Sequence, residues 1–306
     1  MKRDFLSVDD LNPEELAFLL DLSAKVKAQP GDYSERLHGR SVALIFEKPS
    51  TRTRVSFEVA VASAGGHPVP LSSAELQLGG GETIEDTGRV LSRYVDVIVL
   101  RTFEQERLEV LAGAASVPVV NALSDFEHPC QCLADLLTIR ELKGELGGLT
   151  LTYLGDGNNV THSLMLGCAK MGMHFRAATP PGFEPIPLIV ERASEIAAAA
   201  GSTVSVAHDA VEACRDADVL YTDVWASMGQ EAESEERALV FPSYALDQAK
   251  VDVAKEDVTV LHCLPAHRGQ EITDGVIDGS HSAVWDQAEN RMHTQKALLL
   301  WLLGLV

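Results

Sequence analysis

The chain has 306 residues, 46% of them hydrophobic and 23% charged, and this composition indicates a folded globular protein that is long enough for two compact domains. Because 45 Asp and Glu residues outweigh 25 Lys and Arg residues, the net charge of −20 argues against nucleic acids and anionic membranes as partners. The five cysteines are scattered, so we expect no disulfide framework. The apolar run at 297–306 is too short to cross a bilayer, and no signal-peptide core follows the first residues. We therefore expect a cytoplasmic protein without a membrane span.

The first half of the chain alternates between helix-like and strand-like segments. Asn12, Pro13 and Glu15 form a capping box that starts the first predicted helix. An apolar strand at 41–46 is followed, after Pro49, by apolar residues at helical spacing. The later predicted elements of this half are strands at 95–100 and 117–123 and a helix at 128–142.

The second half repeats this alternation after the glycine-rich segment 144–148. It contains predicted strands at 149–154, 175–179, 203–207, 219–222 and 258–261, a helix at 188–200 and a long final helix at 286–303. The alternation predicts an α/β fold with two domains, each a mainly parallel sheet flanked by helices. We place the first domain at 1–145 and the second at 149–286, and we expect the final helix, about 287–306, to pack back on the first domain.

The turn between the strand at 41–46 and the next helix carries three hydroxyls and two guanidiniums. They belong to Ser50, Thr51, Arg52, Thr53 and Arg54. The first amides of a helix lack partners and favour anions, and these side chains add donors for phosphate oxygens. A capped helix with solvated arginines, the simpler interpretation, would need only Ser50. The glycines and lysine of a nucleotide-binding loop are missing, so the pattern favours a small phosphorylated ligand.

Gly155 and Gly157 follow a predicted strand and suggest the start of a dinucleotide-binding turn. Val160, however, occupies the position where that fingerprint requires a third glycine. The remaining pattern predicts a sharp turn in which Asn158 and Asn159 either cap the next helix or face a ligand.

Polar or reactive side chains also follow two later strands. Asp223 and Ser227 come after the strand at 219–222, and Cys263 follows the strand at 258–261. Each has a simpler interpretation, as a helix cap, a turn residue and a buried small side chain respectively. Because the carboxyl ends of parallel strands meet at one edge of a sheet, we expect the three to form a second substrate pocket.

His128, Cys130 and Cys132 offer potential metal ligands at the start of the helix at 128–142. Zinc sites of the finger type need a second Cys/His pair, and none accompanies these residues at that spacing. We therefore expect no metal site.

Five segments of the chain resemble the carbamoyltransferase family. They are residues 46–54, 128–131, 223–229, 262–265 and 289–291. The Ser-Thr-Arg-Thr and His-Pro-x-Gln elements are similar to those of carbamoyltransferases generally, whereas Ser-Met-Gly and His-Cys-Leu-Pro resemble the ornithine branch. The resemblance extends over nearly the whole chain and implies an active site in the cleft between the two domains.

The resemblance implies that one set of residues binds carbamoyl phosphate and another binds L-ornithine. The first set is Ser50, Thr51, Arg52, Thr53, Arg101, His128, Gln131 and Arg291. The second set is Asn159, Asp223, Ser227, Met228, Cys263 and Leu264. The resemblance also implies a homotrimer with shared active sites, in which Gln77 reaches the carbamoyl phosphate of a neighbouring subunit.

The implied reaction is attack of the δ-amine of ornithine on the carbamoyl carbon, through a tetrahedral intermediate, to give L-citrulline and phosphate. It belongs to arginine metabolism and needs no cofactor. The expected catalytic residues are Arg52, Thr53, Arg101, His128 and Cys263. Two alternatives stay open: carbamoyl transfer to another amine, such as putrescine or an N-acylated ornithine, and non-catalytic phosphate binding on the same fold.

Two places depart from the pattern that the resemblance leads us to expect. No basic residue stands at Gly80 or Gly81, where one would contact phosphate from the neighbouring subunit. Phe126 and Glu127 appear in the inverse of the usual order, an inversion that would expose the aromatic ring or re-aim the loop before His128.

Overall fold

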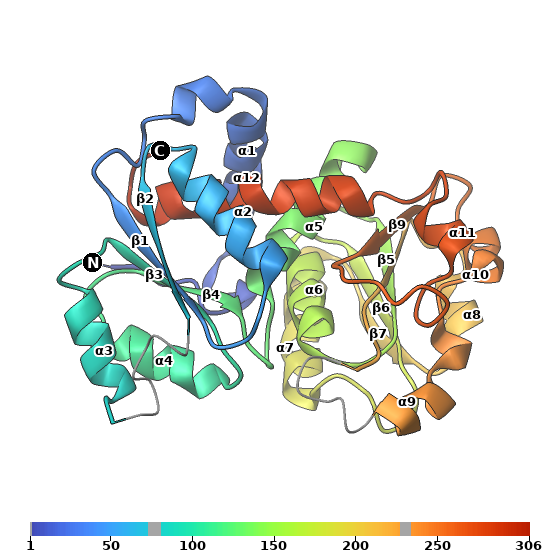
Figure 1. The fold of residues 1–306 in the computed structure, drawn as a ribbon. Coiled ribbons are helices and arrows are strands. Elements are labelled where there is room, and N and C mark those ends of the chain that lie inside the picture. The colour runs from blue at the N-terminus through green and yellow to red at the C-terminus, as the bar shows by residue number, and fades with distance from the viewer. Residues whose placement is uncertain (1, 73–80, 227–233) are drawn as a thin grey trace. The chain divides into compact units, whose positions relative to one another are not determined.

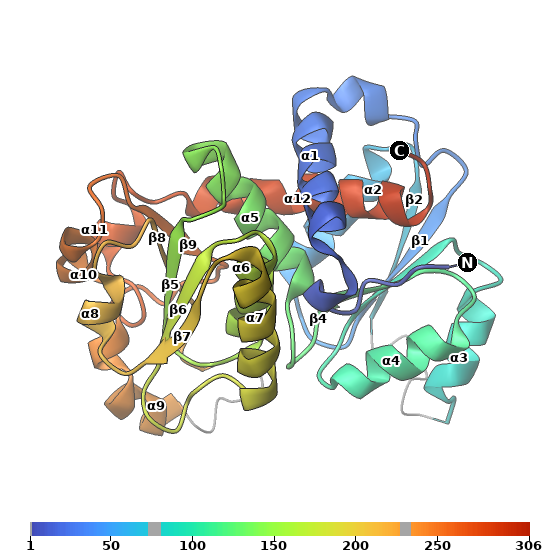
Figure 2. The same cartoon turned by 180° about the vertical axis from the view of Figure 1, so that it is seen from behind.

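The computed structural model describes residues 2–72, 81–226 and 234–306. The chain divides into two compact units, Met1–Ala134 with Asn290–Val306, and Asp135–Glu289. Each unit is a parallel β-sheet with helices on both faces (Figures 1 and 2). This architecture confirms the predicted α/β class with two parallel-sheet domains.

The two units divide inside two long helices. α5 (Pro129–Lys143) crosses the division after Ala134, and α12 (Val284–Leu302) crosses it after Glu289. The glycines near 144–148 follow the end of α5 at Lys143, so they do not coincide with the division after Ala134. The domain limits of 1–145 and 149–286 stay a prediction. Among the described residues, no helix is long and apolar enough to cross a membrane.

A four-stranded sheet forms the centre of the first unit. Its strands lie in the order β2 (His67–Ser72), β1 (Ser41–Phe46), β3 (Val97–Arg101) and β4 (Val119–Leu123). α3 (Ile84–Leu91) and α4 (Gln105–Ala114) lie on one face, and α1 (Pro13–Ala28), α2 (Thr51–Ala62) and the final part of α12 lie on the other (Figure 1). Two short 3-10 helices, η1 (Val8–Asp10) and η2 (Pro30–Tyr33), flank α1 in the sequence.

The strand order of the first unit reverses between β1 and β3. β1 pairs with β2 on one side and with β3 on the other, and all pairs are parallel. Loops that follow such neighbouring strands open at the same edge of the sheet and leave a crevice, where open α/β sheets bind ligands. The loop after β1 carries the Ser50 motif and β3 ends at Arg101, so both lie at this edge.

Sequence patterns predict the inner strands well and miss β2. Pro68 and Pro70 remove two amide donors from β2, a pattern that argues against a strand in the middle of a sheet. β2 is an edge strand that pairs with β1, so the missing donors cost little. The first helix begins as predicted, because Asn12 and Glu15 exchange the two hydrogen bonds of a capping box.

The second unit is built on a five-stranded sheet. Its strands lie in the order β7 (Val204–Ala207), β6 (His174–Ala178), β5 (Thr150–Leu154), β8 (Val219–Thr222) and β9 (Thr259–His262). Besides most of α5 and the start of α12, the helices in the described part of this unit are α6 (Asn159–Lys170), α7 (Pro187–Ala200), α8 (Ala210–Cys214), α9 (Ser234–Val240), η4 (Pro242–Tyr244), α10 (Gln248–Val253) and α11 (Asp274–Ile277). Here the strand order reverses between β5 and β8, so the loops after these strands form the second unit's own ligand-binding edge.

Candidate active site

Ser50 starts α2 at the carboxyl end of β1, as the sequence predicts. Its backbone is extended, and its hydroxyl oxygen accepts a hydrogen bond from the amide of Thr53 over 3.3 Å. Thr51 and Arg52, in the first helical turn, are exposed. An exposed helix N-terminus with hydroxyls and a guanidinium suits a phosphate group, because unpaired amides and the helix dipole both favour negative charge.

The two arginines of the motif differ in their surroundings. Nε of Arg54 lies 2.7 Å from a carboxylate oxygen of Glu58, one turn later on the same helix. Arg54 therefore follows the simpler interpretation of a solvated arginine paired along its own helix. Arg52 lies on the exposed first turn with Ser50 and Thr51.

The hydroxyl of Thr53 is a meeting point for two buried arginines. Arg291, from α12, donates to Oγ1 of Thr53 over 2.9 Å, and Arg101, at the end of β3, donates to the same oxygen over 3.4 Å. All three side chains are at least nine-tenths buried. Residues 53, 101 and 291 are far apart in the sequence, so folding of the first unit creates this cluster.

His128 is buried beside these arginines, directly before α5. Burial lowers the pKa of His128 well below its usual value, and the positive charges of Arg291 and Arg101 lower the pKa further. The imidazole is therefore neutral near pH 7, with one ring nitrogen able to donate a hydrogen bond. Gln131 is also buried and lies in the first turn of α5, where its backbone amide donates to the carbonyl of His128 and its side-chain NH2 group is a further donor. Together these donors suit a carbonyl oxygen that gains negative charge.

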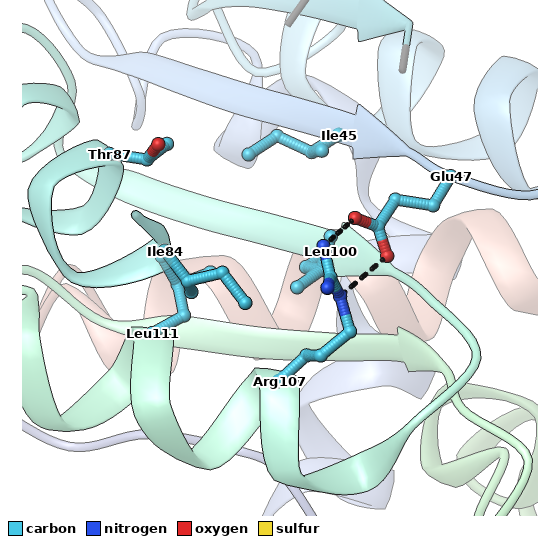
Figure 3. A pocket seen from close by; sticks show the side chains of 7 residues that line it. All are labelled: Ile45, Glu47, Ile84, Thr87, Leu100, Arg107 and Leu111. Carbon is cyan, nitrogen blue, oxygen red and sulfur yellow. Dashed lines mark hydrogen bonds and ion pairs between the residues drawn. The ribbon is translucent and has the colours of Figure 1, made fainter. Parts of the chain in front are cut away.

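Two residues before the phosphate motif, overlooked as site residues in the sequence, hold its loop in place. Glu47 accepts two hydrogen bonds from Arg107, at 2.5 and 3.2 Å (Figure 3). It also accepts one from the hydroxyl of Thr102. Lys48 is buried, pairs with Asp125 and lies over the ring of Phe103. A buried Lys needs a partner of opposite charge. The sequence shows neither that Lys48 is buried nor which carboxylate is its partner, so its role could not be recognised there.

The cavity behind Glu47 is not a substrate site. Its lining residues are Ile45, Glu47, Ile84, Thr87, Leu100, Arg107 and Leu111 (Figure 3). Four of these side chains are aliphatic, and the two charged ones are engaged with each other. The cavity therefore presents no set of donors for a phosphate group.

In the second unit, the carboxylate of Asp223 joins two strand ends. Sγ of Cys263 lies 3.0 Å from Oδ1 of Asp223, and the side-chain amide of Asn158 donates to Oδ2 over 3.0 Å. Burial and then the charge of Asp223 raise the pKa of Tyr153 well above its usual value, so this neighbouring phenol stays neutral. Asp223 and Cys263, which the sequence predicted to converge, are thus in contact, and Asn158, predicted either to cap α6 or to face a ligand, joins them.

Both ends of the side-chain amide of Asn158 are engaged. Its side-chain oxygen accepts from the amides of Val160 and Thr161 and so caps α6. Its side-chain nitrogen reaches Asp223 at the same time. Asn159, the residue predicted to face the ligand, is the first residue of α6 and is buried.

Two family models of known proteins match this chain, one over its first half and one over its second half. The model of the carbamoyl-P binding domain of aspartate/ornithine carbamoyltransferases matches residues 3–141, and the model of their Asp/Orn binding domain matches residues 147–302. The chain belongs to the aspartate/ornithine carbamoyltransferase family.

Individual members of the carbamoyltransferase family are similar over almost the full length. The ornithine carbamoyltransferase of Parafrankia sp. is 60% identical over 304 residues, covering 98% of this chain and 96% of the relative. That of Anoxybacillus flavithermus is 56% identical over 303 residues, again covering 98% and 96%. The solved ornithine carbamoyltransferase of Pyrococcus furiosus has a TM-score of 0.96 at 51% identity and covers 99% of this chain and 97% of its own.

The structure distributes the predicted carbamoyltransferase site residues over the two units. Ser50, Thr51, Arg52, Thr53, Arg101, His128, Gln131 and Arg291 lie in the first unit, and Asn159, Asp223, Cys263 and Leu264 lie in the second. Gln77, Gly80, Ser227 and Met228 lie outside the described residues. In the first unit, residues 50–53 follow β1 and Arg101 ends β3, the two strands at the switch point, whereas His128 and Gln131 follow β4 and Arg291 lies within α12. In the second unit, Asn159 follows β5 and Asp223 follows β8, the two strands at the switch point, whereas Cys263 and Leu264 follow β9.

Close packing explains the glycine at position 157 in the Gly155-x-Gly157 turn. A Cβ atom on Gly157 would lie 2.2 Å from the backbone nitrogen of Pro185, because the chain at 184–185 passes directly against the turn. Gly157 also donates its amide to the carbonyl of Phe183. Close backbone packing therefore requires a glycine at position 157. This packing accounts for the second glycine of the Gly-x-Gly pattern without a bound dinucleotide.

Asp223, His262 and Cys263 have potential metal-ligand atoms within 4.8 Å of one another. Both ring nitrogens of His262 are already engaged: Nδ1 accepts from the amide of Leu264 over 2.9 Å, and Nε2 lies 3.0 Å from Glu271. Because Nδ1 accepts, the proton of the neutral ring is on Nε2. These bonds orient the loop at Leu264, whose φ of 57° is in the left-handed region.

Cys130, which the sequence offered as a potential metal ligand with His128 and Cys132, makes a hydrogen bond within the first unit. Burial raises the pKa of Cys130 to about 12, so its sulfur is a thiol near pH 7. Sγ of Cys130 lies 3.3 Å from the carbonyl oxygen of Asn121, in hydrogen-bond geometry. A thiol that donates to a carbonyl is a packed side chain in the first unit.

Proposed function

We propose that this carbamoyltransferase transfers the carbamoyl group of carbamoyl phosphate to the δ-amine of L-ornithine, giving L-citrulline and phosphate. The observation that carries the proposal is the shared contact of Arg101 and Arg291 with the hydroxyl of Thr53, beside a neutral His128. Thr53, Arg101 and His128 lie in the part of the chain that matches a carbamoyl phosphate-binding domain, and Arg291 lies in the part that matches an Asp/Orn binding domain. The relatives named ornithine carbamoyltransferase favour ornithine as the second substrate.

In this proposal the first unit binds the phosphate end and the carbamoyl end of carbamoyl phosphate with different residues. Ser50, Thr51, Arg52 and Thr53 hold the phosphate at the N-terminus of α2. Arg101, His128, Gln131 and Arg291 surround the carbamoyl group. Support for this division comes from exposure: the start of α2 is open to solvent, whereas Arg101, His128 and Arg291 are buried.

Attack by the amine turns the planar carbamoyl carbon into a tetrahedral one, and its oxygen becomes negatively charged. Thr53, Arg101 and His128 can donate hydrogen bonds to that oxygen without rearranging, because the protein has already fixed them. Removing one preorganised donor of this kind typically costs about 3 kcal/mol of transition-state stabilisation. The bond from the carbamoyl carbon to the phosphate oxygen then breaks, and phosphate leaves.

The second unit binds ornithine in this proposal. Asn159, Asp223, Ser227 and Met228 recognise the α-amino and carboxylate end, and Cys263 and Leu264 lie near the δ-amine. The contact between Asp223 and Cys263 supports this set, because it joins the two groups at one sheet edge.

The δ-amine must lose a proton before it attacks. An alkyl ammonium has a pKa of about 10.4 in water, so deprotonation at pH 7 costs roughly 4 to 5 kcal/mol. Burial next to the positive charges of Arg52 and Arg101 lowers that pKa and so reduces the cost. This first proton goes to water. After the attack the nitrogen carries a second excess proton, which the departing phosphate accepts, and no cofactor takes part.

We further propose a homotrimer that shares its active sites, with Gln77 of one subunit contributing to the next. The exposed face of α2 supports an interface between copies, since Val55 and Val59 follow one another by one helical turn and are 51% and 43% exposed. The neighbouring edge strand β2 also offers unpaired backbone groups. All five cysteines are free, which supports a reducing compartment such as the cytoplasm.

One assay tests the proposed reaction against its alternatives. The enzyme is incubated with carbamoyl phosphate and, in parallel, with ornithine, putrescine and N-acetylornithine, and each carbamoylated product is measured. We expect citrulline from ornithine at a kcat/KM at least about tenfold above that for either other amine, since a missing or blocked α-amino group removes the partner of Asp223. A faster reaction with another amine contradicts ornithine as substrate, and phosphate binding without any product contradicts the catalytic proposal.

A further inference from the structure

Glu127 is a buried carboxylate directly before His128, in the loop between β4 and α5. Only 1% of Glu127 is exposed. The loop closes on itself, because the amide of Ser124 donates to the carbonyl of Glu127 over 2.9 Å and the amide of Glu127 donates to the hydroxyl of Ser124 over 3.1 Å. Any displacement of Glu127 would therefore move the backbone that leads into His128.

The N-terminal segment of the chain supplies hydrogen-bond donors to this carboxylate. The hydroxyl of Ser7 donates to Oε1 of Glu127, and the amide of Val8 donates to Oε2 over 3.0 Å. The oxygen of Ser7 also accepts from the amide of Asp9 at the start of η1, so the orientation of this hydroxyl is fixed. A buried carboxylate without such donors would be strongly unfavourable.

The N-terminal segment is itself fixed to the sheet of the first unit. Phe5 forms a parallel bridge with Val120, in which its amide donates to Val119 over 2.9 Å and its carbonyl accepts from Asn121 over 2.8 Å. Phe5 and Val8 are fully buried. The donors that face Glu127 therefore come from a rigid extension of the β4 edge.

The same loop is held from its other side by the phosphate-binding turn. Asp125 pairs with Lys48, which precedes the Ser50 motif, and the amide of Asp125 donates to the carbonyl of Phe103 over 2.7 Å. Two carboxylates that flank Phe126 thus anchor the loop to different parts of the first unit. Phe126 itself is half-buried. The inverted Phe-Glu order therefore gives the loop an added anchor at Glu127.

We infer that Glu127 is a positioning residue, which together with Ser7 and Val8 holds the loop so that His128 faces the carbamoyl group. This inference rests on the role proposed above for His128. Because His128 serves the carbamoyl end and the α2 N-terminus serves the phosphate end, loss of Glu127 should affect the two ends unequally.

The test compares Glu127→Ala, Glu127→Gln and Ser7→Ala with a matched control, Ser23→Ala. Ser23 is a buried residue of α1 whose hydroxyl donates to the carbonyl of Leu19, so this control also removes a buried hydrogen bond from the first unit. Glu127→Gln keeps an oxygen for the amide of Val8, and its new NH2 group can donate to Ser7. We measure kcat for citrulline formation and inhibition by inorganic phosphate.

Glu127→Ala should lower kcat by about tenfold or more, while the inhibition constant of inorganic phosphate changes by less than about twofold. Glu127→Gln should recover most of the lost rate, Ser7→Ala should fall between, and Ser23→Ala should keep the kcat of the unchanged enzyme. A Glu127→Ala enzyme with unchanged kcat overturns the inference. So does one in which kcat and phosphate affinity fall together, because that is a general loss of structure.

A second measurement does not depend on the reaction. The imidazole of His128 is titrated by NMR in the unchanged protein and in Glu127→Ala. A displaced loop takes the ring away from Arg101, Arg291 and its buried site, so its pKa should rise toward the ordinary value of about 6.5. An unchanged pKa overturns the inference. If the unchanged protein makes no citrulline, the proposed function fails while this titration still decides the role of Glu127.

Discussion

The thiol of Cys263 and the carboxylate of Asp223 are hydrogen-bonded over 3.0 Å, although the two residues follow different strands of the second unit, β9 and β8. Oδ2 of the same carboxylate receives the side-chain amide of Asn158. Asp223 therefore presents a buried, oriented negative charge at the switch point of the sheet. Such a charge suits an ammonium group, which a neutral pocket would hold weakly.

Asp223→Asn should raise KM for ornithine by about 10- to 100-fold, because the substrate ammonium loses a charged partner worth about 1.4 to 2.8 kcal/mol. KM for carbamoyl phosphate should stay within about twofold, since the residues proposed for that substrate lie in the first unit. Steady-state kinetics with each substrate varied in turn checks both values. Asp218→Asn is the control: Asp218 is also buried, but it precedes β8, where it accepts from Thr150 and Lys255. Equal effects of the two substitutions on ornithine would contradict the assignment.

Thr53→Val keeps the shape of the side chain and removes the oxygen that Arg101 and Arg291 share. We expect kcat to fall by about 100-fold, the usual size for loss of one preorganised donor. Thr152→Val removes a buried hydroxyl that donates to Ala213 in the second unit, and it should leave kcat nearly unchanged. Initial-rate measurements at saturating substrates give both numbers. A Thr53→Val enzyme as active as the Thr152→Val control would contradict a catalytic role for this hydroxyl.

The stability of the protein should fall on acidification partly because of His128. Its pKa is lowered in the folded state, so below about pH 6.5 the unfolded chain takes up a proton that the folded protein does not. The free energy of unfolding therefore decreases as the pH drops from the unfolded pKa toward the folded one, and it is independent of this group at higher pH. Urea unfolding at pH 8 and pH 5.5 should show a smaller loss for His128→Gln than for the unchanged protein. His67→Gln, at an exposed position, should behave like the unchanged protein, and an equal loss in all three would refute the prediction.

Gly157→Ala should destabilise the second unit by about 1 to 3 kcal/mol or more, because the new Cβ would lie 2.2 Å from backbone at Pro185. Gly147→Ala is a suitable comparison, since the nearest atom to its Cβ is 4.0 Å away. Thermal unfolding of both variants measures the difference. Equal melting temperatures would show that the 184–185 segment moves away without cost, and the packing explanation of the glycine turn would then be wrong.

Much of the fold could be predicted from the sequence, because inner strands and capped helices carry local signals. Residues 42–45 of β1 are buried on both faces and read as a continuous apolar run, and the capping box at Asn12 fixes the start of α1. β2 was missed because Pro68 and Pro70 contradict strand propensity, and only its edge position makes them acceptable.

The candidate site divides in the same way. The type of chemistry at Ser50 through Thr53 is a local property, because the hydroxyls, the guanidinium and the first helix amides that favour an anion are all close together in the sequence. The neutrality of His128 is a different matter, since it depends on burial beside Arg101 and Arg291, which are distant in the chain. No local pattern contains that information.

The sequence by itself therefore determined the α/β class, the anion-favouring chemistry of the turn at 50–54 and the residue types available at the other strand ends, since these follow from local periodicity and side-chain chemistry. Only the tertiary structure decided which of them meet: Thr53 with Arg101 and Arg291, Asp223 with Asn158 and Cys263, and Glu127 with Ser7. The physical reason is that burial and electrostatic coupling depend on distances across the fold, which a linear pattern does not record.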